Sequence, residues 1–391
     1  MISKPRQGQR VLVTGARLPA ALEIIKAIHA EGAEIWAADS LRITPAGVSR
    51  FATGYLCFPS PVFSFKMFST FICDAVHRLG IKLIIPVSEE IFFLAALKED
   101  LAPALLFAPP LDKLRMLHSK WEILNMVTGC GIRVPHTLRV TSRPELSEAL
   151  KKIPGGILKP EFSRGAHEIL FPPHQKLDLG EISNTRPWLV QEKSEGREIS
   201  TYCVIHNGCV LIQTMYLPRY RVGHGASLYF QPIHIPNLAL FVTAFAQKNS
   251  LTGQFSFDLM EDNSGCITLL ECNPRATSGL HLIPPASRWG GVFWGEKISG
   301  EWTSALPCAA KLAVLLLQIL PALREKRCKT LISDLLVARD SLYSLDDALP
   351  MIVSYLSVLE ILWRSRSWPV SGYRAFTHDL EWNGSADDIL K

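Results

Sequence analysis

The stretch that decides the fold runs from residue 254 to residue 275 and reads QFSFDLMEDNSGCITLLECNPR. Residues 254–260 alternate polar and apolar side chains, which is typical of a half-buried strand. Residues 266–273 form a second strand-like run, and the polar segment 261–265 between the two ends in a glycine. The pattern predicts an antiparallel hairpin with its turn at 261–265.

Three oxygen-bearing side chains come together on this predicted hairpin. Asp258 lies near the end of the first strand, and Glu271 and Asn273 lie near the end of the second, two residues apart and therefore on one face. Carboxylates inside such apolar runs need a partner or a metal. Because Mg²⁺ takes one or two carboxylates and completes its shell with substrate phosphates, we predict a metal site at Asp258, Glu271 and Asn273.

Composition narrows the class of protein. The 391 residues fit two or three domains, and 48% hydrophobic against 20% charged residues are enough for large cores. A net charge of +5 without a long run of like charges gives nucleic-acid binding little support. The nine cysteines contain no C-x-x-C pair, which argues against a cysteine-built zinc site.

Targeting signals are weak as well. Residues 1–10 are polar, without the apolar core of a signal peptide, and the odd number of cysteines fits reduced thiols, so we expect a cytoplasmic protein. The strongest apolar run, residues 312–320, is too short to span a bilayer, which takes about 20 residues. We expect no transmembrane segment, and we expect this run to form a buried helix rather than a membrane-surface helix.

The first hundred residues alternate strand and helix signals, which predicts a parallel sheet covered on both faces. The expected strands cover 11–14, 34–38, 56–58 and 83–86, and the expected helices cover 19–30, 65–79 and 88–98. One further helix is expected over 111–128, strands prevail from 137 to 273, and the tail from 309 to 368 is helical and apolar.

The first strand is followed by a segment that only partly matches a dinucleotide-binding fingerprint. Gly15–Ala20 lacks the second and third glycines of G-x-G-x-x-G, and the side chains of Arg17 and Leu18 would obstruct a pyrophosphate. The sequence therefore does not favour a nicotinamide or flavin site.

The spacing from Asp258 to the run Glu271-Cys-Asn273-Pro-Arg275 resembles the metal-binding signature of the ATP-grasp superfamily. This superfamily includes D-alanine ligases, biotin carboxylase and the large chain of carbamoyl-phosphate synthetase. The resemblance implies that Asp258, Glu271 and Asn273 hold Mg²⁺, or Mn²⁺ in its place, on the phosphates of ATP. It also implies that Arg275 is a catalytic residue beside an acyl phosphate.

Two lysines and a short loop fit the same pattern. Lys159, followed by the run Ser163-Arg-Gly165-Ala, resembles the phosphate-binding lysine and the glycine loop that covers ATP, so Lys159 is expected both to bind ATP and to take part in catalysis. A lysine supplies a point charge to phosphate, and small residues let backbone N–H groups approach it. Lys120, with Ser119 where the family usually has Asp, resembles the second nucleotide-binding lysine.

The segment after the glycine loop resembles the hinge between the two ATP-grasp lobes. Backbone groups near Gln191, Glu192, Lys193 and Ser194 would bind the adenine edge, and Glu198 would accept hydrogen bonds from the ribose hydroxyls. The alternative is a charged turn between two strands.

Two further segments are candidates for substrate contacts. Arg219, Arg221 and His224 belong to a basic, glycine-containing loop that can bind the γ-phosphate or a substrate carboxylate, or be an ordinary hairpin loop. Ser278 and Gly279 follow Arg275 and can open a helix towards the substrate.

The resemblance implies an α/β and α+β architecture in three parts. We expect a Rossmann-like parallel sheet over 1–108, a two-lobed ATP-grasp domain over 109–300 with lobes at about 109–187 and 188–300, and a mostly helical region over 301–391.

The implied reaction converts a carboxylate into an acyl phosphate at the expense of ATP and couples it to an amine, forming an amide. The expected partners are therefore a small-molecule carboxylate and an amine. A carboxylase-type enzyme that activates bicarbonate and a non-catalytic ATP-binding protein are the alternatives. The helical tail can cover the substrate pocket, form a homodimer interface, or dock a carrier or lipid.

Overall fold

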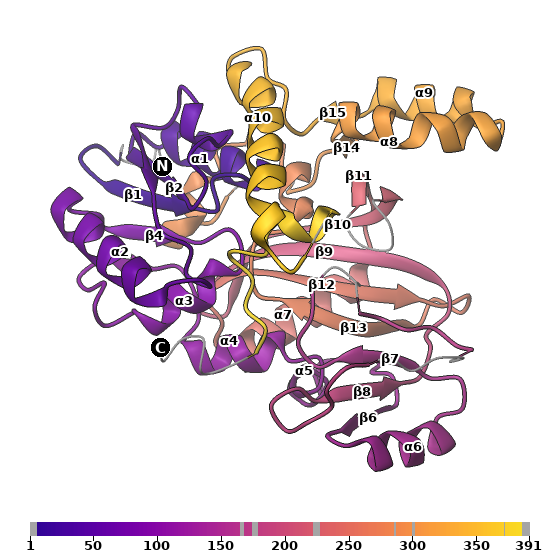
Figure 1. Cartoon of the computed structure of the whole chain (residues 1–391). Coiled ribbons are helices and arrows are strands. Elements are labelled where there is room, and N and C mark those ends of the chain that lie inside the picture. Colours follow the sequence, from indigo (N-terminus) through magenta and orange to yellow (C-terminus); the bar gives the residue numbers. More distant parts are fainter. Residues whose placement is uncertain are drawn as a thin grey trace.

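The computed structural model describes residues 6–164, 168–173, 179–221, 227–284, 287–298, 302–370 and 372–384, and the description below concerns these residues. Three sheets organise the chain (Figure 1). A five-stranded sheet lies at one end, a seven-stranded sheet occupies the middle, and a three-stranded sheet lies at the far side of the middle sheet. This α/β and α+β architecture confirms the fold class predicted from the sequence.

The five-stranded sheet is parallel throughout, with the strand order β3-β2-β1-β4-β5. Its first helix begins with a proline at position N1, and α2 ends at Gly80, whose φ of 63° is the left-handed conformation that favours glycine. The elements are β1 Arg10–Thr14, α1 Pro19–Ala30, β2 Glu34–Asp39, η1 Ala46–Val48, β3 Gly54–Cys57, α2 Phe65–Leu79, β4 Leu83–Ile85, α3 Glu90–Ala96 and β5 Leu105–Leu106.

The single helix expected over 111–128 is wrong, because the chain leaves the helical conformation at Ser119. The helix is divided into α4 (Leu111–His118) and α5 (Glu122–Met126). Ser119 has a ψ of 119°, and the backbone N–H of Lys120 donates to the Glu161 carbonyl 3.2 Å away instead of continuing the helix. The break turns the Lys120 side chain inward, where it is only 3% exposed.

The three-stranded sheet is antiparallel with the order β6-β8-β7, and α6 packs on it. The seven-stranded sheet has the order β13-β12-β9-β10-β11-β14-β15. The elements are β6 Thr137–Val140, α6 Arg143–Lys152, β7 Ile157–Pro160, β8 Trp188–Gln191, β9 Arg197–His206, β10 Cys209–Arg221, β11 Ser227–Pro232, α7 Pro236–Lys248, β12 Gly253–Glu261, β13 Ile267–Asn273, η2 Ser278–Leu282 and η3 Gly290–Trp294.

The expected hairpin is confirmed by the pairing of β12 with β13. The two strands are antiparallel, and Asp258 lies directly opposite Glu271, while Ser256 lies opposite Asn273. A register shift follows Asp258, which is the signature of a β-bulge. The pairing thus brings the three predicted metal ligands to one end of the hairpin.

The tail is helical as expected, but its apolar run is not a buried helix. The elements are β14 Cys308–Ala309, α8 Lys311–Arg324, α9 Cys328–Val337, β15 Arg339–Asp340, α10 Leu349–Arg364, η4 Ser365–Ser367 and η5 Gly372–Phe376. In α8 only Val314 and Ala322 are buried, because the helix packs mainly on α9 and β11 and leaves its outer face in solvent. No helix of the described chain is both long and apolar enough to cross a membrane.

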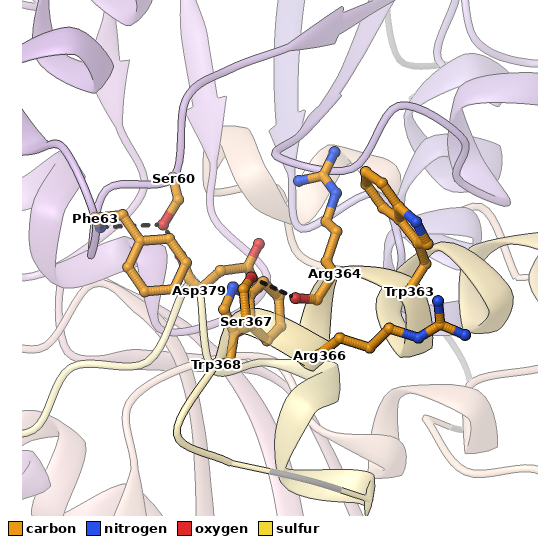
Figure 2. A pocket seen from close by; sticks show the side chains of 8 residues that line it. All are labelled: Ser60, Phe63, Trp363, Arg364, Arg366, Ser367, Trp368 and Asp379. Atoms are coloured by element: carbon orange, nitrogen blue, oxygen red, sulfur yellow. Dashed lines mark hydrogen bonds between the residues drawn. The ribbon is translucent and has the colours of Figure 1, made fainter.

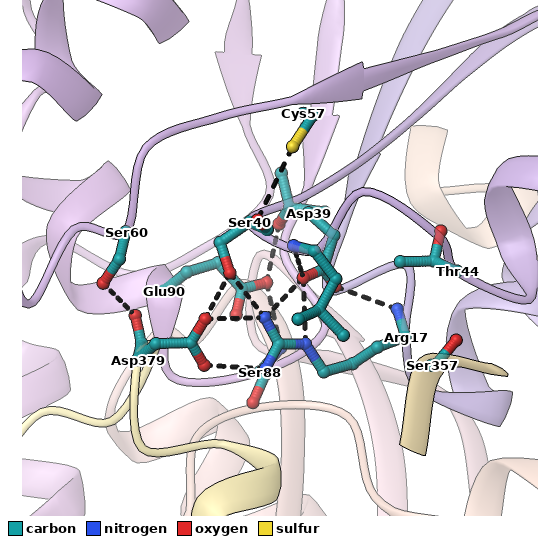
Figure 3. Close-up of polar contacts among 12 residues, drawn as sticks. Arg17, Asp39, Ser40, Thr44, Cys57, Ser60, Ser88, Glu90, Ser357 and Asp379 are labelled. Atoms are coloured by element: carbon teal, nitrogen blue, oxygen red, sulfur yellow. Dashed lines mark hydrogen bonds and ion pairs between the residues drawn. The ribbon is translucent and has the colours of Figure 1, made fainter. Parts of the chain in front are cut away.

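The last described segment of the chain returns to the five-stranded sheet. Arg17 donates to Asp39 (2.9 Å from Nε to Oδ1) and to Asp379 (2.7 Å from Nη1 to Oδ1), and all three side chains are buried (Figure 3). Ser40 donates to Asp379 as well. Arg17, whose side chain was expected to obstruct a pyrophosphate, therefore binds Asp39 and the C-terminal segment.

We predict that Arg17→Met lowers the free energy of unfolding by about 3–5 kcal/mol, since it leaves Asp39 and Asp379 buried without a counter-ion. Burial raises the pKa of Asp379, but Arg17 lowers it further, to below the usual value. In the parent protein the pairing of Asp379 with Arg17 stabilises the folded state at pH values above the ordinary pKa of an aspartate, and this stabilisation is lost as the pH falls. The difference in the free energy of unfolding between the parent and Arg17→Met should therefore become smaller on acidification.

Urea unfolding of both proteins at several pH values checks this. The matched control is Arg10→Met, because Arg10 pairs with Glu34 on the surface, where both side chains are nearly half exposed, and its loss should cost less than about 1 kcal/mol. Equal, small losses in the two variants would contradict the prediction.

Candidate active site

The metal-binding residues expected from the sequence lie together at the end of the β12–β13 hairpin. Ser200 donates to Asp258 Oδ1 at 2.6 Å, and the Asn273 amide donates to Asp258 Oδ2 at 3.0 Å. Burial and the facing Glu271 carboxylate raise the pKa of Asp258 to about 7. The carboxyl groups of Asp258 and Glu271 thus face each other, and Asp258 stays protonated up to about pH 7. Ionisation of both groups would place two negative charges side by side.

Both predicted nucleotide lysines point to the same place. Lys120 Nζ lies 3.4 Å from Glu271 Oε2 and donates to the Ser163 carbonyl at 2.7 Å. Lys159 Nζ lies 3.4 Å from the carbonyl of Leu270, and this side chain is also 3% exposed. Burial would raise the pKa of Glu271, but Lys120, Lys159 and His118 outweigh it and lower the value to about 2.

The charge on Lys159 is only partly compensated. Burial lowers the pKa of its ammonium to about 8, and the neighbouring Lys120 acts in the same direction, while Glu271 opposes both. Two buried cations thus share one carboxylate. A phosphate placed beside them would supply the missing negative charge.

Arg275 extends the cluster from the hairpin to the five-stranded sheet. Its Nη2 donates to Asn273 Oδ1 at 3.2 Å, and its Nε lies 3.4 Å from Oε1 of the buried Glu89. Arg164, at the start of the expected glycine loop, lies 3.6 Å from the same oxygen. Burial would raise the pKa of Glu89, but Arg164, His118 and Arg275 lower it.

The residues present fit a divalent cation. Two opposed carboxylates and one amide offer oxygen ligands of the kind that Mg²⁺ prefers, and the raised pKa of Asp258 is the mark of charge that a cation would relieve. Among the described residues no group of three or more His, Cys, Asp or Glu side chains could hold a metal. Any metal here would therefore depend on the Asp258, Glu271 and Asn273 set, with outside ligands completing its shell.

Several residues of this cluster escaped the sequence reasoning. Glu89 lies four residues after β4 and directly before α3, at the edge where parallel sheets place their ligands, so its position after an apolar strand was a usable signal. Glu161 accepts from Ser119 and from Arg139 Nε at 2.7 Å. Trp382 comes from far along the chain, and its backbone N–H donates to Glu89 at 3.2 Å. No local pattern marks it.

His118 was missed as well. Burial lowers its pKa to about 4, against the opposing pull of Glu89, so its imidazole is neutral at pH 7. Its ring faces Phe92, with centroids 5.1 Å apart, and its buried Nε2 has no hydrogen-bond partner among the described residues.

The expected hinge residues lie at the end of β8, in the segment that follows it and in β9. The Gln191 side chain is buried and donates to Thr137 at 2.9 Å. The backbone N–H of Glu192 donates to the His136 carbonyl at 2.8 Å, and Lys193 lies 3.5 Å from Glu195. Glu198 forms a 2.5 Å ion pair with Arg221.

The remaining substrate candidates lie at different places. Arg219 is 2.7 Å from Asp334 of α9, on the side of the helical tail. Gly279 is packed so closely that a Cβ atom would meet the Cβ of Tyr202 at 2.6 Å, and its carbonyl accepts from Thr214. Ser278 is half-buried at the start of η2. Gly165 and His224 lie outside the described residues.

A separate cavity of about 430 Å³ lies between the loop at Ser60–Phe63 and the end of α10 (Figure 2). Its wall contains three aromatic rings, of Phe63, Trp363 and Trp368, and reaches Asp379. None of the predicted site residues lines it. The charged cluster around Glu271 is therefore the candidate active site, and this cavity is not part of it.

The sequence matches no protein-family model and no curated protein sequence. The structure is similar to N5-carboxyaminoimidazole synthetase from Staphylococcus aureus in complex with ADP, at 13% identity and a TM-score of 0.61, over 78% of this chain and 82% of that one. It is similar to the biotin carboxylase domain of the Hydrogenobacter thermophilus 2-oxoglutarate carboxylase, a dimer with MgADP, ADP and bicarbonate, at 15% identity and a TM-score of 0.59, over 76% and 73%.

L-amino acid ligase from Bacillus licheniformis is a third similar structure, at 11% identity and a TM-score of 0.55, over 74% of each chain. These proteins are ATP-grasp enzymes. The chain therefore has the ATP-grasp fold, and the resemblance carried by Asp258 to Arg275 is confirmed at the level of the fold.

We predict that Glu271→Gln lowers the pKa of Lys159 below about 8, because burial and Lys120 both disfavour the ammonium and Glu271 is the group that opposes them. A ¹³C NMR titration of labelled lysine side chains measures this value. Glu148→Gln is the matched control, since Glu148 pairs with the exposed Lys151 and should leave Lys159 unchanged. An unchanged or raised pKa in Glu271→Gln would exclude Glu271 as the counter-ion.

Proposed function

We propose that this protein is an ATP- and Mg²⁺-dependent ligase that activates a carboxylate as an acyl phosphate and couples it to an amine, releasing ADP and phosphate. One observation carries the proposal: Asp258, Glu271 and Asn273 lie on one hairpin end, with the buried ammonium of Lys120 3.4 Å from Glu271. The ATP-grasp fold supports it, as do the ADP and MgADP in two similar structures.

The charged residues would act mainly by binding and orienting the phosphates. Lys120 and Lys159 would contact the phosphates of ATP, because both are buried and share one carboxylate. Asp258, Glu271 and Asn273 would hold Mg²⁺, which neutralises charge on the phosphates when bound. Phosphoryl transfer needs chiefly positioning and electrostatic stabilisation, and this set of residues provides both.

Arg275, just after β13, and Arg164, after β7, would hold the acid, since their guanidinium groups lie 3.4 and 3.6 Å from Glu89 Oε1. A carboxylate oxygen forms a bond to the γ-phosphorus of ATP as the bond to the β-phosphate oxygen breaks, and ADP leaves. The amine nitrogen then attacks the acyl carbon and loses a proton, and phosphate leaves. The loop that begins at Ser163 would keep water from the acyl phosphate.

The division of labour proposed for the chain follows the three expected parts. Residues 1–108 would bind the acid or the amine, residues 109–300 would bind ATP, and the region from 301 onwards would tie the two together. The segment at Asp379 and Trp382 supports that last role, because it contacts both Arg17 and Glu89.

We predict that Asp258→Asn lowers ATP turnover by about 100-fold to 1000-fold, the usual cost of removing one preorganised electrostatic partner. The substitution replaces a carboxylate whose pKa is about 7 with a neutral isostere, so the metal-free fold should stay as stable. The measurement is release of ADP and phosphate with amino acids and fatty acids, each paired with amines, and mass spectrometry for the amide.

The matched control is Asp262→Asn, four residues along the same hairpin, where the carboxylate accepts from Ser264 and Cys266 in the turn and lies 4.0 Å from the exposed Arg133. Its turnover should equal that of the parent. Parent-level turnover in Asp258→Asn would refute the metal assignment. ADP release with bicarbonate alone would favour a carboxylase, and ATP binding without phosphate release across the panel would favour a binding protein.

A further inference from the structure

The helical hairpin of α8 and α9 projects from the body of the molecule (Figure 1). It rests on β11 through a small core in which Val314, Ala322 and Leu331 are its own buried residues. Its remaining surface has no cover in the described chain. The site proposed above uses none of the residues of this hairpin.

The outer face of the hairpin is a stripe of leucines. Four of them follow one another on α8 at intervals of four, four and three residues, which places them on one side of a helix. They are 40%, 63%, 61% and 58% exposed: Leu312, Leu316, Leu320 and Leu323. On α9, Ile332 and Leu336 are 52% and 78% exposed. Contiguous apolar surface of this kind marks an interaction site.

Cations surround the stripe, and they are unpaired. Four basic side chains of the hairpin form no ion pair or hydrogen bond with any residue that the structure describes: Lys311, Arg324, Lys326 and Lys329. The two acids of the hairpin are engaged, because Glu325 pairs with Arg327 and Asp334 pairs with Arg219. The hairpin thus presents leucines and uncompensated positive charge to solvent.

We propose that the α8–α9 hairpin is an interfacial anchor that binds the surface of an anionic lipid bilayer. Leucines enter the boundary between headgroups and acyl chains, and the four cations contact lipid phosphates. A helix of 14 residues is about 21 Å long, too short to cross the hydrocarbon core, so the hairpin lies on the membrane.

Charge favours a bilayer over a second copy of the chain. A symmetric dimer places the same patch on both subunits, so two hairpins would bring together eight cations with no unpaired acid between them. The exposed face of α10 offers a contrast. It is also apolar, with Leu356 44% and Leu359 61% exposed, but its Arg364 is paired with Glu360. The unpaired cluster belongs to the hairpin.

Co-sedimentation of the whole protein with vesicles tests the proposal. The parent protein should bind vesicles of phosphatidylcholine with phosphatidylglycerol, and added salt should weaken the binding. Vesicles of phosphatidylcholine alone should bind it much more weakly. The double variant Leu316→Gln with Leu320→Gln should lower the partition coefficient by about 100-fold, because two leucine side chains no longer enter the bilayer. Lys326→Gln with Lys329→Gln should lower it by about fivefold per cation, on anionic vesicles only.

Leu240→Gln is the control, because Leu240 is 70% exposed on α7 and the variant replaces an exposed leucine outside the α8–α9 hairpin. This variant should bind the vesicles as the parent does. All variants must show the parent's circular dichroism and melting temperature, which is expected for exposed positions. No binding by the parent, or parent-level binding by the leucine double variant, would overturn the anchor. So would a dimer in light scattering that only the leucine double variant converts to a monomer.

Discussion

Two buried lysines from distant parts of the chain share one carboxylate, and the candidate site depends on that sharing. Lys120 comes from the break after α4, Lys159 from β7 and Glu271 from β13. An ammonium group inside a protein costs several kcal/mol unless it is paired. The carboxylate of Glu271 therefore stabilises the position of three segments at once. Burial lowers the pKa of Lys159 to about 8 and Lys120 acts in the same direction, while Glu271 opposes both. A phosphate beside the two ammonium groups would add negative charge to this setting.

The same cluster connects the five-stranded sheet to the hairpin and to the end of the chain. Glu89, directly before α3, faces Arg275 and Arg164 and accepts from the backbone of Trp382. A few residues earlier, Asp379 is bound by Arg17. Because these contacts are buried, the C-terminal segment is part of the site's wall and not an appendage to it.

The outer helices show how composition alone misleads. An apolar run such as residues 312–320 predicts burial, and α8 is indeed a helix, but its neighbours cover only one side of it. Hydrophobicity specifies that a surface avoids water, and the tertiary structure decides whether that surface meets the core or is left for another partner. The leucines of α8 remain outside, beside cations that pair with no acid in the described part of the chain.

Local patterns in the sequence determined the secondary structure and which side chains near one another in the chain lie on one face. The hairpin of β12 and β13 follows from an alternating run, a second strand-like run and a turn, since strand periodicity and hairpin pairing are short-range properties. The α/β alternation of the first hundred residues predicts the parallel sheet for the same reason. Only the tertiary structure decided that α4 ends at Ser119, that Glu89 meets Arg275, and that Trp382 joins them. Those contacts bury charges from remote segments against one another, and the energy of a buried charge depends on partners that no local pattern names.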